Sequence, residues 1–265
     1  MTVSVVHAAA YTFPAAVAGL ELDLRLSPAP WEMPRTRAAE LSVVPPPTDI
    51  ATMCDDWGNT VRRASFDRPV GRVAIAMHLA VDGEAGDPPA QPACPEDLAL
   101  PDDAPAVPVI PDTMAGIAEA VHLECARLTD GWRFEAHPDG DGVDIAALLR
   151  DRRGRCLELA RLLVWRLRAR AIPARFVLGY ALEPTKRGAV RQRHAWVAYH
   201  DGGRWRAVDP SASDRAAGAL FATAWGPSLA PLMPVRARRP AGLSGVVATW
   251  STQVTRQAMT QVTTT

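Results

Sequence analysis

Three residues have the types and positions that thiol chemistry requires: Cys156, His194 and Asp209. Cys156 lies where a loop ending in Gly154-Arg155 gives way to a helical pattern. A helix N-terminus offers unpaired amide donors and a partial positive charge, which favour the thiolate and lower the pKa of a cysteine. The same amides, including that of Cys156, could hold an oxyanion. A cysteine in this position can also be a small buried apolar residue, so position alone leaves both interpretations open.

His194 and Asp209 lie on one predicted β-hairpin, which turns at Asp201-Gly202. A two-residue turn there sets His194 directly opposite Asp209, and so does a four-residue turn with the same centre, whereas a three-residue turn breaks this register. Directly opposed residues have Cβ atoms about 5 Å apart. That spacing suits a hydrogen bond in which the carboxylate fixes the imidazole tautomer and leaves the other ring nitrogen to face a thiol.

Each of these two residues also has an ordinary structural interpretation. His194 can be a structural histidine at a strand end, and Asp209 can be a turn former before Pro210. Their joint placement with a cysteine at the start of a helix is harder to explain in that way. The three residues together therefore favour a catalytic triad.

The residues up to 86 are predicted to form strands and turns. Apolar and polar side chains alternate from Leu20 to Leu26, which predicts a strand with one buried and one wet face. Val70 to Val81 is a second such stretch, and Trp57-Gly58-Asn59 has the chemistry of a hairpin turn. Several short strands separated by turns indicate a small β-sandwich. Residues 87–111 are rich in proline and are predicted to be an extended linker, a plain spacer.

The remainder of the chain alternates helical and strand patterns. Helices are predicted near 112–129, with Asp112 as N-cap, and over 143–150. A third helix begins at Cys156 and must end near Ala171, because Pro173 disfavours helical geometry in the residue before it. Strand patterns follow at 175–182, 194–200 and 204–209. The helix that carries the cysteine is thus followed by the strands that carry the histidine and the aspartate.

Composition narrows the classes of partner. Lysine plus arginine and aspartate plus glutamate number 29 each, so the formal net charge is zero. A neutral chain lacks the basic surface expected for broad capture of nucleic acid or anionic membrane. No apolar run has membrane-spanning length, the first ten residues lack signal-peptide features, and no cysteine or histidine spacing predicts a metal site. We therefore expect no metal, no organic cofactor, no nucleic-acid or membrane partner, free thiols and a cytoplasmic location.

Further motifs accompany the three candidate residues in a fixed order. They are Trp132-x-Phe134, Gly154-x-Cys156, Leu167-Arg168-Ala169-x-x-Ile172-Pro173-Ala174-Arg175, Gly179-Tyr180, His194-Ala195-Trp196-Val197 and Trp205-x-x-Val208-Asp209-Pro210. In this order and spacing they resemble the core of bacterial transglutaminase-like proteins. The strand at Leu20–Leu26 and the segment Asp56-Trp57-Gly58-Asn59 resemble the β-rich N-terminal domain that often precedes that core. The resemblance covers most of the chain from Val3 to about Pro210.

The resemblance implies an α+β fold: a papain-like transglutaminase core, in which a helix bearing the cysteine packs on an antiparallel sheet, preceded by a small β-sandwich domain. Together with the element pattern, it divides the chain into a β-sandwich over residues 1–86, a proline-rich linker over 87–111 and a catalytic core with a C-terminal extension over 112–265. It implies Cys156 as nucleophile, His194 as general base and acid, and Asp209 as the carboxylate that orients His194.

The implied activity is thiol-dependent acyl transfer, by which a peptide or glutamine-type amide of a peptide or protein substrate is cleaved or exchanged through a thioester. Such an enzyme is a cysteine peptidase or amidase, with transglutaminase activity also open. Arg155 stands where relatives often carry a smaller or apolar residue, and Ala171 where a glycine is usual. These departures bear on specificity and leave the triad intact. The alternative is a catalytically retired scaffold that acts as a protein-binding module; substrate, acyl acceptor and oligomeric state are not fixed by the sequence.

Overall fold

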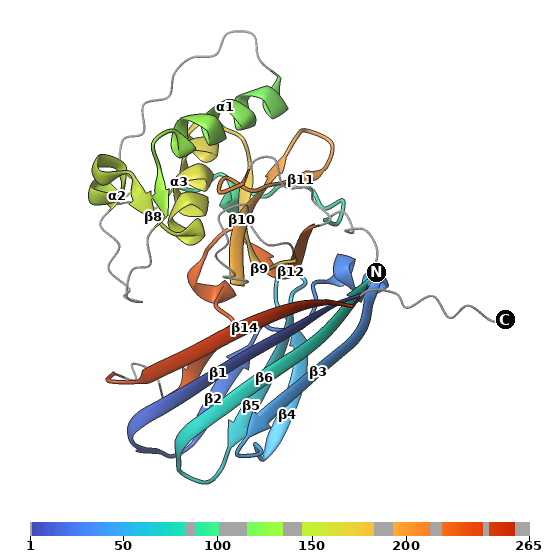
Figure 1. The fold of residues 1–265 in the computed structure, drawn as a ribbon, viewed down its shortest axis with the longest axis vertical. Coiled ribbons are helices and arrows are strands. Elements are labelled where there is room, and N and C mark those ends of the chain that lie inside the picture. Colours follow the sequence, from blue (N-terminus) through green and yellow to red (C-terminus); the bar gives the residue numbers. More distant parts are fainter. Residues whose placement is uncertain are drawn as a thin grey trace, which may run out of the picture.

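The computed structural model describes residues 2–82, 88–100, 116–134, 145–182, 193–212, 219–240 and 244–257. These residues form an α+β protein with two parts (Figure 1). One part is a sandwich of two four-stranded sheets, and the other is a core in which helices lie beside a third four-stranded sheet. The predicted α+β class, with a β-rich N-terminal domain ahead of the core, is confirmed.

The sandwich is built on the alternation seen in the sequence. Its sheets have the strand orders β14-β1-β6-β3 and β13-β2-β5-β4. The inward face of β6 is fully apolar, and its members Val73, Ile75, Met77, Leu79 and Val81 are each no more than 2 % exposed. The other face of β2 is less exposed to solvent than predicted, because Asp23 is buried and forms an ion pair with Arg63 at 2.8 Å. The strands are β1 (Thr2–Val17), β2 (Leu20–Leu24), β3 (Thr36–Val44), β4 (Asp49–Cys54), β5 (Thr60–Phe66), β6 (Val70–Asp82), β13 (Val235–Arg239) and β14 (Val247–Gln257).

The end of the chain returns to the sandwich. Strand β14 pairs antiparallel with β1 over eleven residues, from Thr2 opposite Gln257 to Thr12 opposite Val247, and β13 pairs with β2. Figure 1 shows β14 in red beside β1 in dark blue, although they come from opposite ends of the chain. The sequence pattern predicts residues 112–265 to be a core with a C-terminal extension, which places residues 235–257 with the core. The structure instead uses them to cover the edges that β1 and β2 would otherwise leave unpaired.

The core sheet has the order β11-β10-β9-β12 and is antiparallel throughout. Its strands agree within two residues with the predicted ones at 175–182, 194–200 and 204–209. The first helix begins at Ile117 with Gly116 as its N-cap. The predicted N-cap, Asp112, lies outside the described residues. The core elements are α1 (Ile117–Thr129), β7 (Arg133–Phe134), α2 (Ile145–Asp151), β8 (Arg153–Gly154), α3 (Cys156–Ala169), β9 (Ala174–Ala181), β10 (Arg193–His200), β11 (Trp205–Val208) and β12 (Leu220–Gly226); short 3-10 helices are η1 (Pro30–Arg35), η2 (Pro95–Asp97) and η4 (Ala230–Leu232).

Helix α3 is the central helix of the core and packs on β9 and β10. Its apolar face is fully buried, as Leu159, Leu163 and Leu167 show no exposed surface. Helix α1 is held to α3 by the buried carboxylate of Glu124, whose two oxygens each lie 2.9 Å from an arginine: Arg166 of α3 or Arg170, the C-cap of α3. This packing fixes the position of α3 relative to α1, β9 and β10.

The sandwich covers the free edge of β12. Asn59, fully buried in the β4–β5 turn, donates to the Trp225 carbonyl at 2.8 Å and accepts from the Trp225 amide at 2.9 Å. From η1, the Glu32 carboxylate accepts from the Ala222 amide at 3.0 Å. An edge strand has unpaired backbone groups that need partners. The predicted hairpin turn at Trp57-Gly58-Asn59 therefore also joins the two parts of the molecule.

The described part of the proline-rich segment, residues 88–100, is bound to the core rather than extended in solvent. Asp97 is fully buried in an ion pair with Arg175 at 2.7 Å. The Ala99 carbonyl accepts from Arg168 at 2.6 Å, and the Gln91 carbonyl accepts from the Trp205 indole at 2.9 Å. The prediction of a plain spacer is wrong for these residues, since they form a strap across the sheet.

Helix α3 ends in a backbone conformation that normally requires glycine. Ala171 has a φ of 58°, and the Ile172 amide bonds to the Leu167 carbonyl at 2.9 Å, as in a Schellman motif. A left-handed residue with a Cβ costs about 1–2 kcal/mol, and glycine loses about 0.5–1 kcal/mol through chain entropy. We expect Ala171→Gly to stabilise the protein by about 0.5–1 kcal/mol and to raise the Tm by a few degrees in thermal unfolding. The matched change Ala169→Gly, inside the helix, should lower the Tm; a lower Tm for Ala171→Gly would contradict this account.

Candidate active site

Cys156 is the first residue of α3 and is half-buried. The residue before it, Arg155, has an extended backbone, and its amide donates to the Glu158 carboxylate at 2.7 Å, which closes the first turn of the helix. The Arg155 guanidinium pairs with the same carboxylate at 3.1 Å. This ion pair explains how a large basic residue is accommodated next to the cysteine.

The backbone ahead of Cys156 is held by close packing. Strand β8 pairs in parallel with β7, so that Phe134 lies opposite Gly154. A Cβ on Gly154 would come within 2.9 Å of the Trp132 ring and 3.2 Å of Glu158. The segment Trp132-x-Phe134, far from the cysteine in sequence, therefore positions the loop that leads into α3.

In the hairpin that carries His194, the pairing of the two strands is shifted by two residues from the predicted register. Trp205 pairs with His200, and the turn lies between Asp201 and Arg204, joined by a 3.0 Å hydrogen bond from the Asp201 amide to the Arg204 carbonyl. The prediction that His194 lies directly opposite Asp209 is thus wrong. The glycine pair between Asp201 and Arg204 takes the centre of the turn, and the Asp201 carboxylate caps it by accepting from the Arg204 amide at 2.9 Å. Because the shift is two residues, His194 and Asp209 stay on one face.

The three candidate residues nevertheless come together. His194 Nε2 lies 2.7 Å from Asp209 Oδ2, and both side chains are buried. The imidazole also forms a hydrogen bond with the Cys156 thiol, and the Ala195 amide donates to the same sulfur. Since Nε2 faces Asp209, the ring nitrogen available to the thiol is Nδ1. A thiol, an imidazole and a carboxylate thus form one chain of hydrogen bonds at the start of a helix.

The electrostatics of this chain favour a thiolate–imidazolium pair. Burial alone would lower the pKa of His194, but the hydrogen bonds and charges of Asp209 and Cys156 outweigh it and raise that pKa to about 9. Burial alone would raise the pKa of Cys156, but the hydrogen bond and charge of His194 and the Ala195 amide bring it below its ordinary value. A thiolate beside an imidazolium is the reactive form of a nucleophilic cysteine.

Ser211 is a further polar residue of the site, and the sequence interpretation missed it. Its hydroxyl donates to Asp209 Oδ1 at 2.7 Å and lies 3.4 Å from His194 Nε2. Its amide donates to the same Oδ1 at 2.9 Å. An aspartate often accepts from the amide two residues later, so the Asp209-Pro210-Ser211 sequence carried a signal for this turn.

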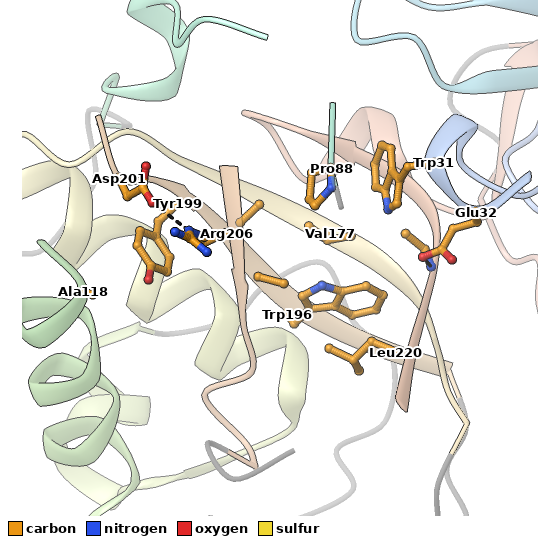
Figure 2. A pocket seen from close by; sticks show the side chains of 13 residues that line it. Trp31, Glu32, Pro88, Ala118, Val177, Trp196, Tyr199, Asp201, Arg206 and Leu220 are labelled. Carbon is orange, nitrogen blue, oxygen red and sulfur yellow. Dashed lines mark hydrogen bonds and ion pairs between the residues drawn. The ribbon is translucent and has the colours of Figure 1, made fainter. Parts of the chain in front are cut away.

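Trp196 links the site to a cavity on the face of the sheet that carries the His194 side chain. Its ring lies parallel to the His194 imidazole, with 6.0 Å between centroids and 20° between planes. It also lines a cavity of about 460 Å³, in which Figure 2 shows Trp31 and Glu32 from η1 facing Trp196 and Leu220. None of the triad residues, all of them described, lines this cavity. Trp196 and Trp205 are both buried.

The remaining cysteines have different surroundings from Cys156. Cys125 of α1 is buried, and burial together with the charges of Asp209 and Glu124 raises the pKa of its thiol to about 12. Burial and the Asp97 side chain raise the pKa of Cys94. Cys54 is exposed on β4, and all four cysteines are free thiols. Among the described residues, no group of three metal-binding side chains occurs, and no helix is long and apolar enough to cross a membrane.

Comparisons with known proteins give the chain a family. Residues 112–210 match the family described as the transglutaminase-like superfamily, and residues 3–82 match the bacterial transglutaminase-like N-terminal region. The first match contains the three candidate site residues, and the second contains the N-terminal strands of the sandwich, from β1 to β6. No curated protein matches the chain.

One solved structure agrees with this chain at the level of the fold, and two others align with lower TM-scores. A candidate cysteine protease from Cytophaga hutchinsonii aligns with a TM-score of 0.69 and 16 % identity, over 96 % of this chain and 90 % of that one. The periplasmic domain of TgpA from Pseudomonas aeruginosa gives 0.36 and 19 %, over 78 % and 88 %. A candidate protease from Parabacteroides distasonis gives 0.34 and 15 %, over 74 % and 43 %. From the two family matches, with the Cytophaga structure in support of the fold, the chain belongs to the transglutaminase-like superfamily and carries the bacterial N-terminal region of that family.

Proposed function

We propose that this protein is a thiol-dependent acyl-transfer enzyme that cleaves, or exchanges, a peptide or glutamine-type amide of a peptide or protein substrate. The observation that carries the proposal is the hydrogen-bonded chain from Cys156 through His194 to Asp209 at the N-terminus of α3. Membership of the transglutaminase-like superfamily supports the same chemistry. We propose Cys156 as nucleophile, His194 as acid and base, and Asp209 as the carboxylate that orients His194.

The first half of the reaction forms a thioester. The Cys156 thiolate donates an electron pair to the amide carbon, and the carbonyl π pair moves to oxygen. The Cys156 amide, at the first position of α3, is the candidate donor to that oxyanion. The carbon–nitrogen bond then breaks as the His194 imidazolium gives its proton to the leaving amine.

The second half regenerates the enzyme. Neutral His194 takes a proton from water, whose oxygen attacks the thioester carbon, and the carbon–sulfur bond breaks to return the thiolate. A primary amine in place of water would give a new amide instead. We propose hydrolysis as the main outcome, because no second, amine-binding site is marked in the sequence. The Asp209 carboxylate stays ionised throughout and stabilises the imidazolium.

The alkylation rate of Cys156 against pH tests the thiolate–imidazolium pair. We expect iodoacetamide, followed site by site by mass spectrometry, to modify Cys156 rapidly well below the free-thiol pKa of ~8.5. In His194→Ala the cysteine loses the hydrogen bond and charge that lower its pKa. The rate in that variant should therefore fall about tenfold or more near pH 6 and should recover only in alkaline solution.

The chain supplies its own reference thiols. Cys94 and Cys125 have raised pKa values and should react slowly in both proteins, while exposed Cys54 reports the reactivity of an accessible thiol. Equal rates at Cys54 in wild type and variant show that the reagent and the fold are unchanged. Slow modification of Cys156 with an ordinary thiol profile that ignores His194 would overturn the proposal and favour a retired scaffold that binds a protein partner.

A further inference from the structure

We infer that Ser211 is a positioning residue, which holds the Asp209 carboxylate in the orientation that His194 requires. The inference rests on the proposed function, because it concerns the same chain of groups. Neither family motif nor comparison assigns a role to this serine. It acts through Asp209: its hydroxyl lies 2.7 Å from Asp209 Oδ1 and 3.4 Å from His194 Nε2.

The two oxygens of Asp209 have separate partners. Oδ2 faces His194 Nε2 at 2.7 Å, while Oδ1 accepts from the Ser211 hydroxyl at 2.7 Å and from the Ser211 amide at 2.9 Å. Asp209 follows the last residue of β11, Val208, so its backbone lies beyond the strand. The two donors on Oδ1 therefore fix the plane of a carboxylate that the sheet ladder does not fix, and Oδ2 stays directed at the imidazole.

The Ser211 hydroxyl acts on His194 through Asp209, because its own distance to the imidazole is long. Because its proton is donated to Asp209, its oxygen keeps lone pairs that face His194 Nε2 at 3.4 Å, long for a hydrogen bond. In the part of the chain that the structure describes, the titratable groups that act on the pair are Cys156 from α3 and Cys125 from α1. Cys125, with a pKa of about 12, is neutral over the whole range in which His194 works. Ser211 is therefore a neutral donor at the end of the chain that does not compete for the imidazolium proton.

Removing the hydroxyl should weaken the pair without abolishing it. In Ser211→Ala the amide still donates to Oδ1, so Asp209 keeps one of two donors from this residue. A net hydrogen bond is worth about three- to tenfold in an equilibrium. We expect alkylation of Cys156 near pH 6 to slow about three- to tenfold, with the profile displaced to higher pH. Ser211→Thr keeps the hydroxyl and should restore the wild-type profile.

A double-mutant cycle separates positioning from general structural damage. If Ser211 acts through Asp209, Ser211→Ala should have no further effect on the profile in an Asp209→Ala background. Equal additional slowing in both backgrounds, or a wild-type profile for Ser211→Ala, would overturn the inference. Thermal unfolding of each variant identifies any that fail to fold, and Ser211→Thr then carries the test.

The failure of the inference can be told apart from failure of the proposed function. If wild-type Cys156 reacts as an ordinary thiol and ignores His194, the proposed function fails and Ser211 has nothing to position. If the wild-type profile is lowered and depends on His194 and Asp209, while Ser211→Ala leaves it unchanged, the proposed function stands and only the role of Ser211 is wrong.

Discussion

Cys156→Ala is expected to abolish acyl transfer while the protein remains folded. The alanine has no sulfur to attack a carbonyl, and loss of the nucleophile from such a triad costs about 10⁴-fold or more in rate. An activated ester, p-nitrophenyl acetate, is a suitable first acyl donor because it needs little binding energy. Wild-type protein should release nitrophenolate in a burst and gain one acetyl group at Cys156 by mass spectrometry. The variant should show neither.

The control for this experiment is Cys54→Ala, which removes an exposed thiol on the sandwich and should react like wild type. Acetylation of the Cys156→Ala variant at the wild-type rate would show that another residue carries the chemistry. Once an acyl-enzyme is trapped, glutamine peptides can be screened in two ways. Ammonia release reports hydrolysis, and incorporation of a fluorescent primary amine reports exchange.

The site could be predicted from sequence because its residues have local signatures. Cys156 follows a glycine loop and begins a strongly amphipathic helix, and His194 and Asp209 share one hairpin. The exact turn was not predictable, because Asp201-Gly202 and Gly202-Gly203 are both good turn centres. His194 and Asp209 still lie on one face of the hairpin, because the register differs from the predicted one by two residues. A shift of one would have turned Asp209 to the opposite face of the sheet.

Contacts between segments that are far apart in the sequence could not be predicted from it. The strap over residues 88–100 depends on the ion pair between Asp97 and Arg175. No sequence motif near either residue indicates that the other is its partner. Once folded, that guanidinium lies 4.3 Å from the ring centroids of both Trp205 and Trp225, so four distant parts of the chain meet at one buried cation. In the same way, the largely polar segment Val247–Gln257 gives no indication that it pairs with β1. Pairing of strands from the two ends of a chain is set by global packing and has no local sequence signal.

Gly179 is the residue whose substitution should destabilise the fold most. It lies in β9 directly opposite His194 and beside the irregular pairing of β9 with β12. A Cβ at this position would overlap the Phe221 carbonyl oxygen and come within 2.9 Å of Ala222 Cα. Both atoms belong to the backbone of β12. This backbone cannot easily move, because Glu32 of η1 accepts a hydrogen bond from the Ala222 amide.

We therefore expect Gly179→Ala to destabilise the protein by about 3 kcal/mol or more, at or above the upper end of ordinary overpacking. In thermal unfolding this corresponds to a Tm lower by about 6–12 °C. Gly71→Ala is the matched control, because Gly71 also lies in a strand but has open space where its Cβ would be. If Gly179→Ala melted within a degree or two of Gly71→Ala, the close approach of β9 and β12 would be wrong. Because Gly179 faces His194 across the ladder, any Gly179→Ala protein that folds should also alkylate Cys156 more slowly near pH 6, which ties the packing of this strand to the reactivity of the thiol.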